Sequence, residues 1–198
     1  NMTGADVIRF MIKKASKISG GVDMKNGMNY PQLISKYTMG AVLYHQACDN
    51  YLDEKMTASN KPNDKPYKKG AYYTGKEHSW DEAFGYWGAA AHTMTLSAQQ
   101  SYDVAKKKDL KAADFNKDGV VDLYKEMTYG HAYYASAFDK GGKTDYLKTV
   151  TKAFIDGRKI ITAADGNKLS SSDLTKVQDL AQVICSNWAQ VIAEAVHK

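Results

Sequence analysis

The sequence predicts an all-α protein, an antiparallel helical bundle of about six helices with an inserted calcium-type loop. Apolar residues recur at alternating three- and four-residue spacing through most of the 198 residues, which is the pattern of amphipathic helices. Only 3 prolines occur, which suits long helices because proline disrupts a helix interior. No alternating polar and apolar run is long enough to indicate a strand. We expect residues 1–198 to form a single domain.

The first two helices have recognisable ends. Residues 4–18 are expected to form a helix that ends at Gly20, because glycine readily adopts the left-handed conformation that stops a helix. The second helix is expected to begin at Tyr30, just before a proline, since proline is favoured in a first helical turn. Its apolar stripe continues to Tyr51. Residues 56–75 are rich in Asn, Pro, Lys and Gly and form a long connector of the kind that is often functional or mobile.

The remainder of the chain predicts four more helices. They are expected over about residues 78–106, 123–138, 144–164 and from 170 to the end of the sequence. In the first of these, Gly85 and Gly88 are small enough to let another helix approach closely. The last apolar pattern is unbroken near Lys198 and the sequence begins at Asn1 rather than Met. We therefore expect a processed protein or part of a longer exported chain.

Charge and hydropathy exclude two classes of partner. The net charge of +5 is spread along the chain, and the two lysine-rich runs, residues 65–69 and 106–108, lack the interleaved stacking aromatics of a nucleic-acid platform. They are interpreted as solvated surface, so no nucleic-acid partner is expected. No stretch approaches the roughly 20 apolar residues of a membrane helix. No membrane span is expected, although a lipid anchor outside this sequence is compatible with export.

Two cysteines, Cys48 and Cys185, are the only ones in the sequence. Each lies in an apolar helical stripe, which favours a pair of buried, reduced thiols. A disulfide between two distant helices is the alternative, and it would favour an oxidising compartment.

A short acidic segment has the spacing of a calcium loop. Oxygen-bearing side chains stand at loop positions 1, 3, 5 and 9, a glycine stands at position 6, and a backbone carbonyl is available at position 7. These positions are Asp114, Asn116, Asp118, Asp122, Gly119 and Val120. Position 12 is Lys125, where a glutamate normally closes the site, and Glu126 follows one residue later. The alternative is an Asx-rich turn without an ion, in which the same side chains bond backbone amides.

A second polar cluster begins the expected third helix. Glu77 and Asp81 are four residues apart, as are His78 and Glu82, so each pair is adjacent on a helix surface. A histidine and carboxylates beside small residues can hold a metal in a bundle. Alternatively, acidic residues in a first turn stabilise the exposed amides and the helix dipole.

These residues also carry a family resemblance. The segment EHSWDEAFGYWG at residues 77–88, the helix at 30–52 and the segment FIDGRKII at 154–161 resemble the imelysin-like proteins of the bacterial cell envelope. The resemblance implies a helical bundle, export to the periplasm or outer surface, and a role in iron uptake or as a metallopeptidase. The family signature is Gly-x-His-x-x-Glu, and the nearest match here contains His78, Asp81 and Glu82, with the glycine at Gly75.

Three functions follow as hypotheses. The leading one is a non-enzymatic ligand- or metal-binding module that is periplasmic, outer-membrane-associated or secreted, with a structural calcium loop and a link to iron uptake. The second is a metal-dependent peptidase, in which His78 with Asp81 or Glu82 would bind iron or zinc. The third is a structural or assembly protein. No serine elbow, Cys–His pair or phosphate loop occurs in the sequence.

Overall fold

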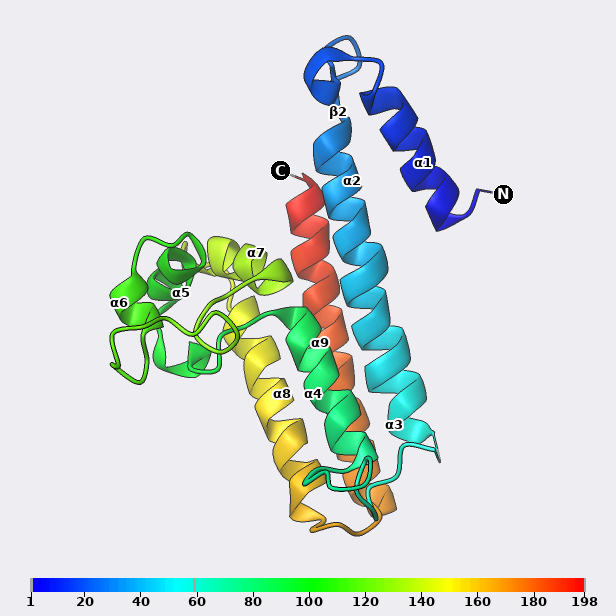
Figure 1. The fold of residues 1–198 in the computed structure, drawn as a ribbon, viewed down its shortest axis with the longest axis vertical. Helices are drawn as coiled ribbons and strands as arrows, with labels where there is room; N and C mark the ends of the chain where they lie inside the picture. The colour runs from blue at the N-terminus through cyan, green and yellow to red at the C-terminus, as the bar shows by residue number, and fades with distance from the viewer. Residues whose placement is uncertain (1, 59, 198) are drawn as a thin grey trace.

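A bundle of long antiparallel helices forms the body of the protein, which confirms the predicted fold class (Figure 1). The computed structural model describes residues 2–58 and 60–197. Helix α4 (Gly75–Trp87) packs between the long second helix and α8 (Tyr146–Ala163). Helix α9 (Ser171–His197) runs back along α8 as the second arm of a helical hairpin.

The predicted second helix is continuous over its whole expected length. It begins as α2 (Tyr30–Thr38), continues through two π-helical segments, η2 (Met39–Tyr44) and η3 (Gln46–Glu54), and ends as α3 (Lys55–Thr57). The Asn29 side chain accepts a hydrogen bond from the Gln32 amide and so caps the first turn.

An N-terminal arm packs beside the top of α2 (Figure 1). Helix α1 (Gly4–Ala15) starts at a capping box between Thr3 and Asp6 and ends three residues earlier than predicted. A short 3-10 turn, η1 (Ser19–Gly21), leads to an antiparallel hairpin of β1 (Val22–Asp23) and β2 (Met28–Asn29), with Val22 opposite Asn29. Strands of two residues are too short to show an alternating pattern, which explains why none was predicted.

The predicted single helix over residues 78–106 is wrong, because α4 ends at Gly88. This glycine has a φ of 85°, and an added Cβ would lie 2.7 Å from the Tyr129 carbonyl oxygen. Glycine alone tolerates both constraints. The chain therefore leaves the bundle and forms a side lobe, residues 89–129 (Figure 1). The lobe contains η4 (Thr93–Thr95), α5 (Ala98–Ala105) and α6 (Leu110–Ala113).

The predicted helix over residues 123–138 begins seven residues late. Residues 122–126 form a turn, and the Tyr129 amide donates to the Gly88 carbonyl over 2.7 Å, which ties the end of the side lobe to its beginning. Helix α7 (Gly130–Asp139) starts only after that contact. The apolar stripe of residues 123–138 does not show that the Tyr129 amide bonds the Gly88 carbonyl and so is not part of a helix.

Tryptophans dominate the main core. Trp80, Trp87 and Trp188 are almost fully buried, and Trp87 meets Trp188 edge-to-face with ring centroids 5.0 Å apart. The side lobe has a small core of its own, formed by Leu96, Val104, Ala113 and Met127. Within the described residues, no helix is both long and apolar enough to cross a membrane.

Candidate functional sites

The first candidate site is the start of α4, which is held by its own cap. The Thr74 hydroxyl accepts a hydrogen bond from the Glu77 amide, and the Glu77 carboxylate accepts one from the Thr74 amide over 2.8 Å. This capping box fixes the register of the first turn. The side chains of residues 77 and 81 point to one side of α4, and those of residues 78 and 82 point to another side.

Glu77 and Asp81 point toward α8, where both bind one arginine. Arg158 donates from Nη1 to Glu77 Oε1 over 2.6 Å and from Nε to Asp81 Oδ1 over 2.8 Å. Glu77 Oε1 also accepts from the Thr162 hydroxyl over 2.9 Å. Burial raises the pKa of Glu77, but the Thr74 amide, the Thr162 hydroxyl and the Arg158 charge outweigh it, so the pKa lies below its ordinary value. These two carboxylates form a structural ion-pair network between helices.

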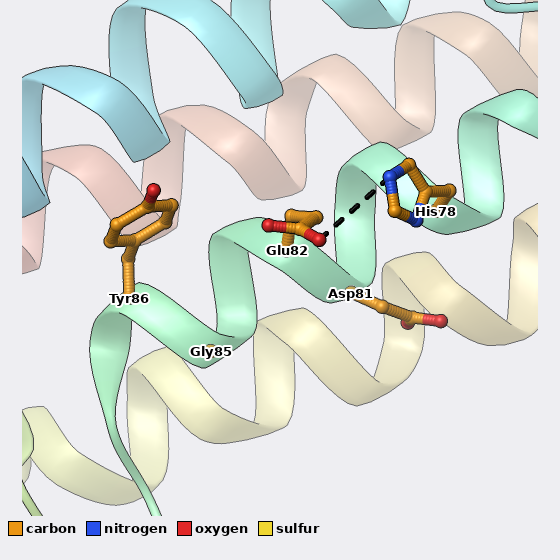
Figure 2. Close-up of a pocket in the computed structure, with 5 residues that line it drawn as sticks. All are labelled: His78, Asp81, Glu82, Gly85 and Tyr86. Atoms are coloured by element: carbon orange, nitrogen blue, oxygen red, sulfur yellow. Dashed lines mark ion pairs between the residues drawn. The ribbon is translucent and has the colours of Figure 1, made fainter.

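His78 and Glu82 lie on the other side of α4. His78 Nε2 is 3.7 Å from Glu82 Oε1, and the imidazole stacks on Tyr67 with ring centroids 3.9 Å apart. Figure 2 shows both side chains turned away from Asp81. The long connector over residues 60–74 thus provides an aromatic ring that orients the histidine.

A shallow depression lies over this part of α4. It has a volume of about 380 Å³ and is lined by His78, Asp81, Glu82, Gly85 and Tyr86 (Figure 2). Gly85 has open space where a Cβ would stand, so the predicted close helix approach at Gly85 is wrong. The missing side chain at Gly85 leaves part of this space open.

The structure divides the four predicted residues of this site into two pairs. No group of three or more His, Cys, Asp or Glu side chains that could hold a metal ion occurs in residues 2–58 and 60–197. The sequence reasoning missed Arg158, which neutralises Glu77 and Asp81. Its signal was available, because Arg158 is one of only two arginines in the sequence and lies in the quoted segment FIDGRKII.

The second candidate site is the acidic loop that follows α6. Asp114 Oδ2 accepts a hydrogen bond from the Gly119 amide over 2.9 Å, and Gly119 has a φ of 85°. Asn116 Oδ1 accepts from the Asp118 amide over 3.0 Å, and Asp118 Oδ1 accepts from the Val120 amide over 2.8 Å. Asx turns therefore shape the loop, as both hypotheses require.

Glu126 closes the loop from inside. It is 6% exposed, its Oε1 accepts from the Phe115 and Asn116 amides, and its Oε2 accepts from the Asp122 amide over 2.8 Å. Glu126 reaches the loop from a turn at residues 122–126, not from a helix. Three backbone amides are its partners.

One oxygen of the loop is left over. Asp114 Oδ1 is buried and has no hydrogen-bond partner. A buried carboxylate oxygen without a partner carries a desolvation cost of about 1–3 kcal/mol or more. The other oxygen of the same carboxylate already bonds Gly119, so Asp114 is held with Oδ1 fixed in place.

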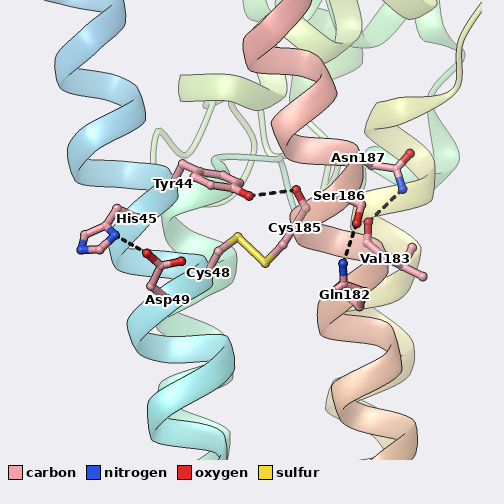
Figure 3. Close-up of a disulfide and its surroundings, with 9 residues drawn as sticks. All are labelled: Tyr44, His45, Cys48, Asp49, Gln182, Val183, Cys185, Ser186 and Asn187. Atoms are coloured by element: carbon pink, nitrogen blue, oxygen red, sulfur yellow. Dashed lines mark hydrogen bonds and ion pairs between the residues drawn. A yellow bond between two sulfur atoms is a disulfide. The ribbon is translucent and has the colours of Figure 1, made fainter.

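A disulfide links two helices of the bundle. Cys48 on η3 and Cys185 on α9 are bonded across 137 residues, with their Cα atoms 5.8 Å apart (Figure 3). The favoured interpretation of two reduced thiols is therefore wrong. Two apolar stripes cannot show that their cysteines meet, because that depends on how the helices pack. The Tyr44 hydroxyl donates to the Cys185 carbonyl beside the bond.

Comparison with known families finds one match, a domain of unknown function named DUF4856, over residues 22–195. The chain belongs to this family. The matched region runs from β1 through most of α9, so it includes both candidate sites, the side lobe and the disulfide. No curated protein matches the chain, and no solved structure matches it. The family description assigns the DUF4856 domain no activity, so function must be argued from its residues.

Proposed function

We propose that this DUF4856 domain is a non-enzymatic binding module of the cell envelope whose side lobe is stabilised by one calcium ion. The observation that carries the proposal is the Asp114 carboxylate. One of its oxygens accepts the Gly119 amide, and the other is buried without a partner. A calcium ion prefers such a carboxylate oxygen as a ligand and would remove its desolvation cost.

The remaining ligands come from the same loop. Asp114, Asn116, Asp118, Asp122 and Glu126 would supply side-chain oxygens, and Val120 would supply its carbonyl. Calcium accepts carboxylate, amide and carbonyl oxygens together. The described residues, this loop included, contain no preformed group of three or more His, Cys, Asp or Glu side chains that could hold a metal ion, so the ion itself would have to bring these oxygens together. Binding would draw the carboxylates of Asp118 and Asp122 toward the ion, and Glu126 would exchange one of its bonds to the Phe115, Asn116 and Asp122 amides for a bond to the ion.

A structural role suits the side lobe. Its core has only four buried apolar residues, and the loop connects α6 to the turn that leads back to α7. A small core contributes little to the free energy of unfolding, and a bound metal commonly adds the stability that such a core lacks. We therefore expect calcium to hold the lobe together and to leave the disulfide-linked bundle unchanged.

The depression beside His78 and Glu82 is the proposed place for a second ligand, either a small molecule or a metal ion such as iron or zinc. The alternative, an imelysin-type peptidase, needs a metal held by His78 with Asp81 or Glu82. Arg158 binds Asp81 and Glu77, which leaves His78 and Glu82 as the available pair. Catalytic zinc sites use three protein ligands, so the arrangement favours binding over hydrolysis.

Location outside the cytoplasm is part of the proposal. A disulfide persists in oxidising compartments and is rare in the cytosol, and Cys48 and Cys185 are bonded. The proposed locations are the periplasm, the outer-membrane surface or the exterior. A scaffold role, the third hypothesis, would require neither ligand site.

The test is thermal unfolding of the purified protein in calcium and in chelator. Calcium is expected to raise the melting temperature, and Asp118→Ala should remove the difference. The matched control is Asp179→Ala, which removes an exposed carboxylate from α9 and should leave the calcium effect intact. Identical melting of the wild-type protein in calcium and in chelator would count against the proposal.

A further inference from the structure

A groove far from both candidate sites lies where three helices converge. Its volume is about 630 Å³, within the range of about 300–1,000 Å³ that is usual for small-molecule sites. The hairpin and α2 form one wall, α7 forms another, and the end of α9 forms the third. Figure 1 shows α2, α7 and the end of α9 meeting near the C-terminus.

The walls of the groove are mainly apolar. Met28, Leu33, Ala137, Phe138 and Val196 line it. Met28 is 41% exposed and Val196 is 66% exposed, so apolar surface remains in contact with water at its rim. Apolar surface of this kind gains free energy when an apolar ligand covers it.

One positive charge lies in this apolar surface. Among the described residues that line the groove, Lys36 carries the only charge. Its amine donates a hydrogen bond to the Tyr134 hydroxyl and lies 3.7 Å from the centroid of that ring. Within residues 2–58 and 60–197, no ion pair joins Lys36 to a carboxylate. An ammonium has three donors, and the bond to Tyr134 uses one of them, so a ligand anion could take another.

Further lysines lie around the tyrosines of α7. The Lys106 amine is 4.9 Å from the Tyr133 ring centroid. The Lys140 amine is 3.8 Å from the ring centroid of Tyr102, which stacks on Tyr133. Tyrosine rings are thus the partners of both lysine amines.

We propose that this groove binds an aliphatic carboxylate, with its headgroup at Lys36 and its chain along Met28, Leu33 and Phe138. Charge complementarity selects the anion, because the described residues of the lining include a cation and no carboxylate. The apolar walls select the aliphatic chain. This ligand class rests on the proposed binding function, but it is independent of the calcium loop, which lies in the side lobe.

The test is calorimetric titration of the full chain with decanoate, below the concentration at which decanoate forms micelles. Decyltrimethylammonium has the same chain with the opposite charge and serves as the matched ligand. We expect decanoate to bind at one site and decyltrimethylammonium to bind at least tenfold more weakly. Equal affinity for the two, or no binding of decanoate, overturns the proposal.

Two variants locate the site. Lys36→Met keeps the length of the side chain and removes its charge, and it should weaken decanoate binding about tenfold. Lys55→Met is the control, because the Lys55 amine also lies over a tyrosine ring, 3.8 Å from the centroid of Tyr51. It should leave the affinity unchanged. Decanoate affinity that falls equally in both variants, or in neither, refutes the assignment to Lys36.

Filling the groove with a larger side chain provides a second test of the decanoate site. Ala137→Phe places a ring in the space and should abolish decanoate binding while the helical circular dichroism spectrum stays the same. Unchanged binding in this variant contradicts the site. Decanoate titrations in calcium and in chelator separate the two proposals, since failure of calcium to bind leaves the decanoate result standing.

Discussion

Substitution of Gly157 by alanine should destabilise the protein, although alanine is the better helix former. Gly157 lies in α8 and faces Trp80 on α4. An added Cβ would stand 2.1 Å from Trp80 Cζ2, which is far inside any real contact distance. The tryptophan is 1% exposed and its Nε1 donates to the Phe154 carbonyl over 2.8 Å. The indole therefore cannot move without losing packing or its hydrogen bond.

The expected change in the free energy of unfolding has three contributions. Overpacking a core costs about 1–3 kcal/mol, and loss of the indole hydrogen bond costs about 1 kcal/mol. Replacing an interior helical glycine by alanine returns up to about 1 kcal/mol. The net destabilisation of Gly157→Ala is about 2 kcal/mol, which should lower the melting temperature by roughly 4–8 °C for a chain of this length.

Urea unfolding followed by circular dichroism measures this change, with the disulfide intact in every sample. Gly85→Ala is the matched control, because Gly85 is also helical but has no heavy atom within 4 Å of the added Cβ. It should be neutral or stabilising by up to about 1 kcal/mol. Equal stabilisation by the two substitutions would refute the inferred contact between α4 and α8.

Three further changes should alter stability. Arg158→Met should cost about 2–4 kcal/mol in urea at pH 7, because it leaves the Glu77 carboxylate buried without its cation. Replacing Cys48 and Cys185 together by alanine should cost about 3–5 kcal/mol, because the bond closes a loop with a sequence separation of 137 residues. Burial and the charge of Lys36 lower the pKa of His131 from 6.5 to about 4, so stability should fall as the pH drops from about 6.5 to 4, by up to about 3 kcal/mol, and His131→Phe should reduce that fall.

A specific experimental result would contradict each of these three stability predictions. A fully stable Arg158→Met protein would mean that Glu77 does not need its partner. Unchanged stability of the wild-type protein in reductant would mean that the disulfide does not constrain the unfolded chain. For His131, the sign is decisive: its neutral form is favoured in the folded state, so stability is present above pH 6.5 and is lost toward pH 4. A rise in stability over that range would refute the assignment.

The helices were predictable because their apolar stripes have a clear period. Most of the long helices fall close to their expected ranges, and the helix start predicted at Tyr30 from the following proline was correct. The side lobe was not predictable from that period. It depends on Gly88, which a helical stripe tolerates as a small residue, yet which has a left-handed conformation against Tyr129. The local sequence pattern does not distinguish a glycine inside a helix from a left-handed glycine that ends one.

The candidate sites were predictable as segments but not as contacts. The spacing of Glu77, His78, Asp81 and Glu82 placed them on a helix, whereas their partners come from α8 and the connector. A residue 77 positions away, Arg158, determines what Asp81 can bind. In the acidic loop the hydrogen-bond partners are close in sequence, so the sequence could predict its Asx turns.

The most direct test of the central claim is a calcium titration of the calcium-free protein by calorimetry. We predict one bound calcium per chain with a dissociation constant on the order of 0.1 mM, as in extracellular modules. Asp114→Asn keeps the shape of the side chain and removes its charge, and it should weaken this binding at least tenfold. No calcium binding by the wild-type protein, or equal binding by Asp114→Asn, would contradict the account.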